Sequence, residues 1–535
     1  MWLLSTMITL ITALMSPNNV TELPPLFTAA PSAVIPQGTI KGFRDAHCNS
    51  VYLGIPFAAT TGGKNRWHPP QDVRPSTSQV EAVSYGATCP QAKVKKQYSR
   101  QGEDCLNLNI WAPPDARKSS ALPVFVFMYG GAMVTGSNSN PQLQGTNFAR
   151  KDVIYVNFNT RESIFAYPHS SEIDEAYPGQ SQNLGILDVN KALEWVHSNI
   201  RAFGGNPDHI VFGGHSSGSV QVDHYLWNHP DTWLKGAVQM SANAMSGPAY
   251  APMDEAMDAV AAEVGCPAAG NRQLECLRKV DIYTLETAMF NSTLNTWFTP
   301  VIDDITRHAD YAFRFNQGKY PSHVSLLTGT ADKEGNIFSL VYGKAGNFSS
   351  WINTFDADCA HIPDCVLRGA YKDLDSESRR IGTQYGDARF NCPVDYLIDM
   401  RSGTQSTWVY RFFGKYDNVV GPPNTAPTHG TEVPFFHGGH ECFDSLEGVT
   451  SEQQALADFT HDWFVAWIKN PAAGPGWAKA SPGSGPLVKL GMPGANTELT
   501  RVDGSTADYN ALCKKVYAPA FPKYPVVQSG WAGTR

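Results

Sequence analysis

The sequence predicts an α/β fold with a central, mostly parallel β-sheet, helices on both faces of that sheet and a small β region near the N-terminus. From residue 124 onward, short apolar runs alternate with segments of helical periodicity, as in strands joined by crossover helices. The runs are apolar throughout, which is typical of parallel strands covered on both faces. A chain of 535 residues that is 42% hydrophobic can also bury a large core.

The expected elements follow in order along the chain. Residues from about 34 to 70 read as short strands and turns, and Pro56 places the strand over residues 51–57 near a sheet edge. Helical spacing of apolar residues predicts a helix over residues 187–200, stopped by the Gly-Gly-Asn-Pro at 204–207. The segment from about 471 to 496 is rich in Pro and Gly and reads as a surface loop. Buried strands are expected at residues 122–128, 154–156, 210–212, 324–327 and 408–410.

The N-terminal residues indicate a secreted protein. Residues 1–16 are apolar, too short to cross a bilayer comfortably, and end in small and turn-forming residues, so we expect a signal peptide although a basic start is missing. The alternative is an uncleaved N-terminal anchor, and no later segment is expected to span a membrane. Residues 17–535 then form one α/β domain with insertions. Sequons at Asn19, Asn291 and Asn347 are candidate glycosylation sites. The net charge of −8 argues against nucleic-acid binding.

One motif suggests a catalytic serine. Ser216 lies in Gly214-His215-Ser216-Ser217-Gly218, directly after the apolar run at 210–212 and before a segment that can be helical. Glycines on both sides allow a turn so tight that the serine hydroxyl stands clear, which is a nucleophile elbow. The pentapeptide is weak alone, but the strand over residues 122–128 ends in a Gly-rich turn that can present backbone N–H groups to an oxyanion.

Several segments around this motif carry a specific resemblance. Asn-Leu-Gly-Ile-Leu-Asp at 183–188, Ala-Leu-Glu-Trp-Val at 192–196 and Phe-Gly-Gly-Asn-Pro at 203–207 lead into the elbow, and Glu-Asp-Cys-Leu-Asn-Leu-Asn stands at 103–109. This order resembles the type-B carboxylesterase/lipase family of α/β-hydrolases, which includes cholinesterases, carboxylesterases and fungal lipases. The similarity runs from about Gly38 to Trp467. It implies the α/β-hydrolase fold and a serine esterase activity.

A serine nucleophile needs a base, and the base needs an orienting carboxylate. The resemblance assigns the acid to Glu334, which follows a predicted strand, with Asp332 as the local competitor. It assigns the base to His429, because residues 428–435 match the family's His-Gly-x-Glu-[Ile/Val]-Pro-Phe segment. His437 and His440 are the nearby alternatives.

The resemblance also implies an oxyanion hole made by the backbone N–H groups of Gly131, Ala132 and Ser217. The chain departs from the family pattern here. Ala132 stands where a third glycine is usual, and His215 and Ser217 stand where the family has Glu and Ala. No N–H group is lost, so these changes bear on substrate preference rather than on the reaction. Trp297 and Phe298 are candidates for an acyl pocket or for core packing.

The ten cysteines are informative by placement. The resemblance implies disulfides Cys89–Cys105 and Cys266–Cys276, and it suggests that Cys392 pairs with Cys513. Cys359 and Cys365 can close a small loop, and Cys48 and Cys442 are then paired together or free. A reduced cytosolic esterase is the alternative. The Cys89–Cys105 loop is short, mostly basic and without tryptophan, so it cannot serve as an apolar lid or bind choline as in the family's lipases and cholinesterases.

We therefore expect a secreted carboxylic-ester hydrolase that acts through an acyl-enzyme on soluble short-chain or aromatic esters, without a cofactor or a metal. An acyltransferase or lactone-forming enzyme could use the same triad. A non-catalytic binding protein of the neuroligin type is a third hypothesis, and the presence of Ser216, Glu334 and His429 argues against it. The oligomeric state stays open.

Overall fold

The computed structural model describes residues 29–91, 98–246, 249–250, 254–267, 270, 272–289, 298–343, 346–354, 362–420, 426–483, 485–492, 502–521 and 527–528. The expected signal segment and the sequons at Asn19 and Asn291 lie outside these residues. Asn347 lies inside them and is exposed, just before helix α13 (Phe348–Thr354).

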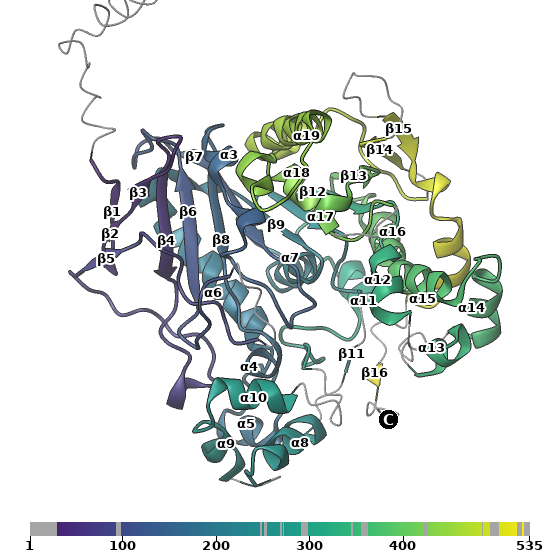
Figure 1. The fold of residues 1–535 in the computed structure, drawn as a ribbon, viewed down its shortest axis with the longest axis horizontal. Helices are drawn as coiled ribbons and strands as arrows, with labels where there is room; N and C mark the ends of the chain where they lie inside the picture. Colours follow the sequence, from purple (N-terminus) through teal and green to yellow (C-terminus); the bar gives the residue numbers. More distant parts are fainter. Residues whose placement is uncertain are drawn as a thin grey trace, which may run out of the picture.

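An eleven-stranded sheet organises the molecule (Figure 1). Its six central pairings are parallel, and the pairings toward both edges are antiparallel. From one edge to the other, the strands are β15 (Val502–Ser505), β14 (Pro486–Leu490), β13 (Thr407–Phe412), β12 (Ser325–Ala331), β10 (Gly236–Met240), β9 (Gly205–His215), β7 (Leu122–Met128), β8 (Ile154–Phe158), β6 (Asn107–Ala112), β4 (Ser50–Pro56) and β3 (Phe43–Arg44). This confirms the predicted fold class.

A small separate sheet at the N-terminal side matches the expected β region. It contains β1 (Ser32–Ile35), β2 (Gly38–Lys41) and β5 (Gln79–Glu81) and lies beside the edge of the large sheet in Figure 1. Strand β4 ends at Pro56 and is separated from the sheet edge only by the two-residue β3. A proline at a strand end costs the sheet no interior hydrogen bond, as expected.

Helices cover both faces of the large sheet. On one face, the Phe212 ring of β9 packs 5.9 Å from Tyr225 of α7 (Ser217–Asn228). On the other, the Phe125 ring of β7 packs 5.3 Å from Phe464 of α19 (Ser451–Lys469). The predicted helix before the elbow is α6 (Leu184–Asn199), and a short 3₁₀ turn follows it and ends at Gly204, whose φ is 97°. The other helices that bear on the site are α12 (Asn336–Tyr342), α15 (Glu377–Gly386), α16 (Cys392–Arg401) and α18 (Val433–Phe436).

A cluster of short helices lies at the bottom of Figure 1: α4 (Ser163–Ala166), α5 (Ser171–Ala176), α8 (Glu255–Glu263), α9 (Arg272–Leu277) and α10 (Ile282–Met289). The disulfide Cys266–Cys276 lies here, and Cys89–Cys105 and Cys392–Cys513 also form, as the resemblance implied. Cys48 and Cys442 are both free. Cys365 is free as well, and its suggested partner Cys359 lies outside the described residues.

The prediction of a continuous surface loop over 471–496 is wrong in its central part. Strand β14 (Pro486–Leu490) pairs with β13 and β15 there and buries Leu487, Val488 and Leu490. The surrounding Pro and Gly residues hid a short apolar strand that starts on a proline, the one place where a missing N–H costs least.

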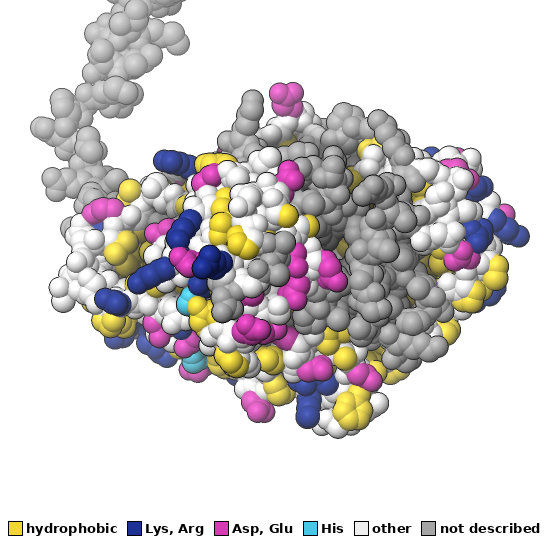
Figure 2. Space-filling model, turned by 90° about the horizontal axis from the view of Figure 1, so that it is seen from below, with side chains coloured by type: hydrophobic (Ala, Val, Ile, Leu, Met, Phe, Trp, Pro, Cys, Tyr) yellow, Lys and Arg dark blue, Asp and Glu magenta, His cyan; other side chains and the backbone are white. Residues whose placement is uncertain are grey.

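Within the described part of the chain, no helix combines the length and apolarity needed to cross a bilayer. The face drawn in Figure 2 shows Lys and Arg side chains lying among Asp and Glu side chains.

Candidate active site

The elbow around Ser216 is a strained turn between β9 and α7. Ser216 has φ 56° and ψ −126°, in the left-handed half of backbone space that costs an L-residue roughly 1–2 kcal/mol. The flanking glycines are sterically required. A Cβ on Gly214 would lie 2.5 Å from the Gly218 carbonyl, and a Cβ on Gly218 would clash with the carbonyl oxygen of Met128. The two glycines of the Gly-x-Ser-x-Gly motif therefore allow this strand and helix to meet so closely.

Two further side chains complete a chain of hydrogen bonds from Ser216. The Nε2 atom of His429 lies 2.7 Å from Ser216 Oγ, and its Nδ1 atom lies 2.6 Å from Glu334 Oε2. Glu334 is fully buried, and the His429 side chain is only 11% exposed. The structure thus brings together the three candidate residues. His429 is 95 residues from Glu334 and 213 residues from Ser216 in the sequence.

The segments that carry Glu334 and His429 are tied to each other. The Lys333 N–H donates to the Pro427 carbonyl, and the Thr428 hydroxyl donates to the Glu334 carbonyl. The same hydroxyl accepts from the Ile337 N–H at the start of α12. These bonds hold the acid and the imidazole in register although each sits on a loop.

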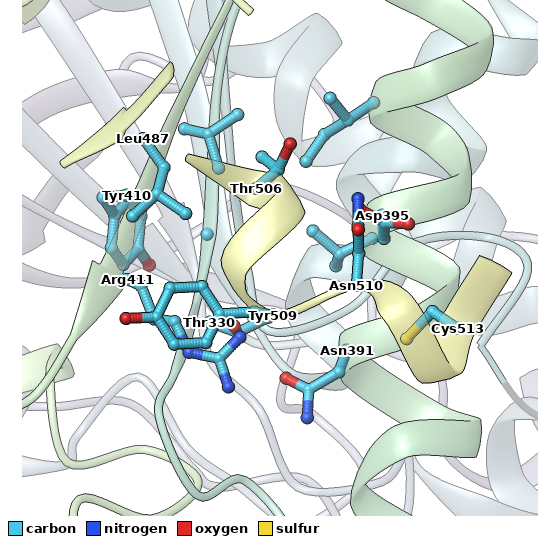
Figure 3. A pocket seen from close by; sticks show the side chains of 14 residues that line it. Thr330, Asn391, Asp395, Tyr410, Arg411, Leu487, Thr506, Tyr509, Asn510 and Cys513 are labelled. Carbon is cyan, nitrogen blue, oxygen red and sulfur yellow. The ribbon is translucent and has the colours of Figure 1, made fainter. Parts of the chain in front are cut away.

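Asp332, the competing acid, has another partner. Its carboxylate pairs with Arg411 at 3.0 Å and with Lys333 at 3.2 Å. Arg411 lies against the Tyr509 ring and lines a cavity between β12, β13 and α16 (Figure 3), to which Asn391, Asp395 and Asn510 also contribute. Neither Ser216 nor His429 lines that cavity, so it is separate from the serine site.

The competing histidines are also engaged elsewhere. His437 is fully buried, with Nε2 bonded to the Tyr155 hydroxyl and Nδ1 bonded to the Val433 carbonyl. His440 lies at the surface and pairs with Asp458 at 3.0 Å. Neither contacts Ser216.

The Gly-rich turn after β7 has an unusual backbone. Gly131, Ala132 and Met133 have φ values of 153°, 57° and 61°. In the described part of the chain, the N–H groups of Gly131, Ala132 and Ser217 donate no hydrogen bond. Free N–H groups at a tight turn and at the first position of a helix are suited to bind an oxyanion. Glycine adopts a positive φ without strain, whereas the methyl group of Ala132 makes this conformation strained.

Sequence reasoning missed a second buried carboxylate beside the acid. The Ser241 hydroxyl lies 2.6 Å from Glu334 Oε1 and 2.9 Å from Glu432 Oε1, and all three residues are fully buried. Glu334 also accepts from the Ala331 N–H. Glu432 was already part of the matched His429 segment, whereas nothing in the sequence around Ser241 pointed to this role.

The number of protons available to Ser241, Glu334 and Glu432 indicates which of the two carboxyl groups is protonated. A serine hydroxyl has one proton and can donate to only one of the two carboxyl groups. The shorter contact is to Glu334, so the contact with Glu432 needs a proton from Glu432 itself. Burial, reinforced by the nearby Glu334 charge, raises the pKa of Glu432 to about 8. Burial also raises the pKa of Glu334 to about 7, but the Ser241 hydroxyl, the Ala331 N–H and the Arg411 charge oppose the rise.

Replacing Glu432 with Gln is therefore expected to stabilise the protein increasingly as pH rises. The usual glutamate pKa is 4.5, so the folded wild type binds an extra proton between about pH 4.5 and 8 and loses stability with increasing pH. Glutamine mimics the protonated acid and removes this loss, which amounts to at most about 1.4 kcal/mol for each pH unit. Urea unfolding at pH 5, 6, 7 and 8 measures the gap.

The surface variant Glu447→Gln is the matched control and should show no widening gap. A stability difference between Glu432→Gln and wild type that stays constant across this range would mean that Glu432 is ionised in the folded protein.

Aromatic rings surround the imidazole. Phe390 stacks on His429 with ring centroids 4.1 Å apart, and His215 and Phe338 lie 4.6 and 5.6 Å away. Phe298, a candidate for the acyl pocket, is instead buried among the short helices, with its ring 6.1 Å from His169. Trp297 lies outside the described residues.

Comparisons with known proteins show the family to which the chain belongs. The model of the Carboxylesterase family matches residues 29–503. Para-nitrobenzyl esterase of Bacillus subtilis (strain 168) is 29% identical over 451 residues, covering 81% of this chain and 87% of the relative. Acetylcholinesterase of Electrophorus electricus is 32% identical over 474 residues, covering 75% and 74%. The crystal structure of EstA from Aspergillus niger superposes with a TM-score of 0.77 at 22% identity, covering 93% and 99%. The chain therefore belongs to the carboxylesterase family, has the α/β-hydrolase fold and is a carboxylic ester hydrolase.

Proposed function

We propose that the protein is a secreted esterase that works through an acyl-enzyme on Ser216, with His429 as the base and Glu334 as the orienting acid. The observation that carries the proposal is the continuous chain Ser216–His429–Glu334, with contacts of 2.7 and 2.6 Å. It also argues against a non-catalytic binding protein, because such a protein has no need of a buried acid aligned with a serine.

The reaction follows from these contacts. Ser216 Oγ attacks the ester carbonyl while its proton passes to His429 Nε2, and the N–H groups of Gly131, Ala132 and Ser217 stabilise the oxyanion. As the tetrahedral intermediate collapses, His429 returns the proton to the alcohol, which leaves. Water then attacks the acyl-enzyme, with His429 taking its proton and passing it to Ser216 as the carboxylic acid forms. Burial lowers the pKa of His429 to about 3, which favours the neutral base before each attack.

Secretion is supported by three disulfides and by an exposed sequon asparagine, Asn347. Structural disulfides persist in oxidising compartments and are rare in a reducing cytosol. The apolar segment at residues 1–16 fits this location as a signal peptide.

The anchored ends of the Cys89–Cys105 loop support a preference for soluble esters. Glu103 pairs with Arg66 at 2.6 Å, and Gln101 donates to Glu286 at 2.9 Å in the α10 helix. Gln91 bonds the Gly136 backbone through both its carbonyl and its amide. These contacts fix the described ends of the loop, and the sequence between its cysteines is short and polar rather than long and apolar. Lys93, Lys95 and Lys96 lie outside the described residues.

We expect hydrolysis of short-chain and aromatic p-nitrophenyl esters, and a rate with tributyrin that shows no jump above its solubility limit. The measurement is initial rate against tributyrin concentration across that limit, beside a chain-length series of p-nitrophenyl esters. A sharp jump would show that another segment acts as a lid. The same series with an added alcohol distinguishes acyl transfer, because a transferase would form the new ester in preference to the free acid.

A further inference from the structure

We infer that His215 and Phe390 are positioning residues whose rings hold the His429 imidazole in its reactive orientation. This inference rests on the proposed role of His429 as the base. Phe390 stacks on His429 with centroids 4.1 Å apart and planes at 26°, and the His215 ring lies at 4.6 Å with planes at 41°. Imidazole faces packed against other rings at such distances are restrained in rotation about the Cα–Cβ and Cβ–Cγ bonds.

The His215 ring packs against His429, and no hydrogen bond joins these two side chains. The Nε2 atom of His215 is buried and has no hydrogen-bond partner among the described residues. A hydrogen bond from Nε2 therefore does not account for the place of this residue beside His429. Burial and the neighbouring His429 lower the pKa of His215 well below its usual value, so the ring is neutral when His429 becomes an imidazolium.

Two glycines make room for the His215 ring. A Cβ on Gly130 would lie 2.7 Å from the His215 carbonyl oxygen and 3.0 Å from His215 Nδ1, and a Cβ on Gly430 would lie 3.3 Å from His215 Cε1. Gly130 belongs to the oxyanion turn, and Gly430 directly follows the base. The ring therefore spans the two loops that must keep a fixed distance for the reaction.

The position of Phe390 is fixed by its surroundings. It lies in a π-helical turn (Asp387–Asn391) between α15 and α16, just before Cys392 of the disulfide to Cys513. It is only 6% exposed and packs with Val220 of α7 and with Ala242. Its ring can therefore move little relative to the elbow helix.

The contacts identify the polar and charged groups that affect the pKa of His429. Glu334 bonds its Nδ1 atom, Ser216 bonds its Nε2 atom and His215 faces its ring, while Ser241, Glu432 and Arg411 act on it through Glu334. Phe390 and Phe338 are uncharged. Removing a covering ring admits water and brings the His429 pKa back toward its usual value of about 6.5, while leaving all these charges in place.

The test replaces the ring and the polar atoms separately. His215→Gln removes the ring but keeps polar atoms, and His215→Phe keeps a ring but removes the nitrogens. We expect kcat for p-nitrophenyl butyrate to fall about tenfold in His215→Gln with KM within about twofold, because a loosened base reacts less often from the right geometry. His215→Phe should stay within about threefold of wild type. Phe390→Leu should behave as His215→Gln, and Phe390→Tyr as wild type.

The pH profile supplies a readout that a simple packing defect would not move. In His215→Gln and Phe390→Leu, the acid limb of kcat should shift upward toward pH 6.5, so that activity at pH 5 falls more than activity at pH 8. Phe313→Leu, which changes an exposed phenylalanine away from these rings, is the control and should leave the limb in place. Thermal unfolding of each variant checks that it is folded.

Three outcomes would overturn the inference. His215→Phe could be as damaging as His215→Gln, which would show that the nitrogens matter. KM could rise with kcat unchanged, which would place these rings against the substrate. The acid limb could stay where it is in both ring-removing variants. If the wild type shows no hydrolysis that depends on Ser216, the proposed function itself has failed instead.

Discussion

Replacing Ser216 with alanine is expected to lower ester turnover by about 10⁵-fold or more, the scale of loss when a serine nucleophile is removed. The Ser216 hydroxyl bonds His429, projects from a turn and supports no part of the core, so the fold should remain. Turnover of p-nitrophenyl butyrate and the temperature of unfolding, measured on the same preparation, separate the two effects.

The neighbouring Ser217→Ala variant is the matched control. It keeps the backbone N–H that we assign to the oxyanion hole and removes only a hydroxyl, so activity should stay within a few-fold of wild type. A Ser216→Ala enzyme that retained activity within a few-fold of wild type would refute the assignment of the nucleophile.

Replacing Glu334 with Gln is expected to cost about 10⁴-fold in kcat, the loss caused by the corresponding acid-to-amide change in a serine protease. The Glu334 Oε1 atom accepts from Ser241 and Ala331, so in a glutamine this position keeps the amide oxygen. The amide NH₂ then faces His429 Nδ1 and forces that atom to accept. The imidazole proton moves to Nε2, where it blocks abstraction of the Ser216 proton.

Asp332→Asn tests the alternative acid two residues away. Because Asp332 pairs with Arg411 and Lys333 and does not contact His429, this change should lower kcat only a few-fold. If Asp332→Asn proves to be the damaging variant and Glu334→Gln does not, the acid has been misassigned. Steady-state kinetics at pH 7.5 for both variants decides between them.

The fold and the elbow around Ser216 could be predicted because they depend on local patterns, whereas Glu334 and His429 were predicted only from the family resemblance. The β7 strand and residues 210–212 of β9 are uninterrupted apolar runs, and the glycines at 214 and 218 are required by close backbone contacts that leave a fixed spacing in the sequence. Strand β14 was missed for the opposite reason. It is five residues long, begins with a proline and owes its place to pairing with β13 and β15 rather than to its own pattern.

The surroundings of the triad could not be predicted because they are made by contacts between distant segments. Ser241 contacts Glu432, which lies 191 residues later in the sequence. Phe390 stacks on His429 from the π-helical turn between α15 and α16. Serine and phenylalanine carry no local mark of such roles. The role of Glu432 depends on full burial beside a second carboxylate, which only the folded chain reveals.

The disulfide between Cys392 and Cys513 bears on how the protein can be produced. Its two cysteines are separated by 121 residues, so Cys513 leaves the ribosome only after the whole segment that follows Cys392 has been made. Until then, the Cys392 thiol coexists with those of Cys48, Cys365 and Cys442, each able to form a wrong bond. A correct bond across a loop of this length is worth about 4–5 kcal/mol in the chain-entropy picture. Recombinant yield should therefore be limited by thiol shuffling, and a host with an oxidising compartment and a disulfide isomerase is the appropriate one.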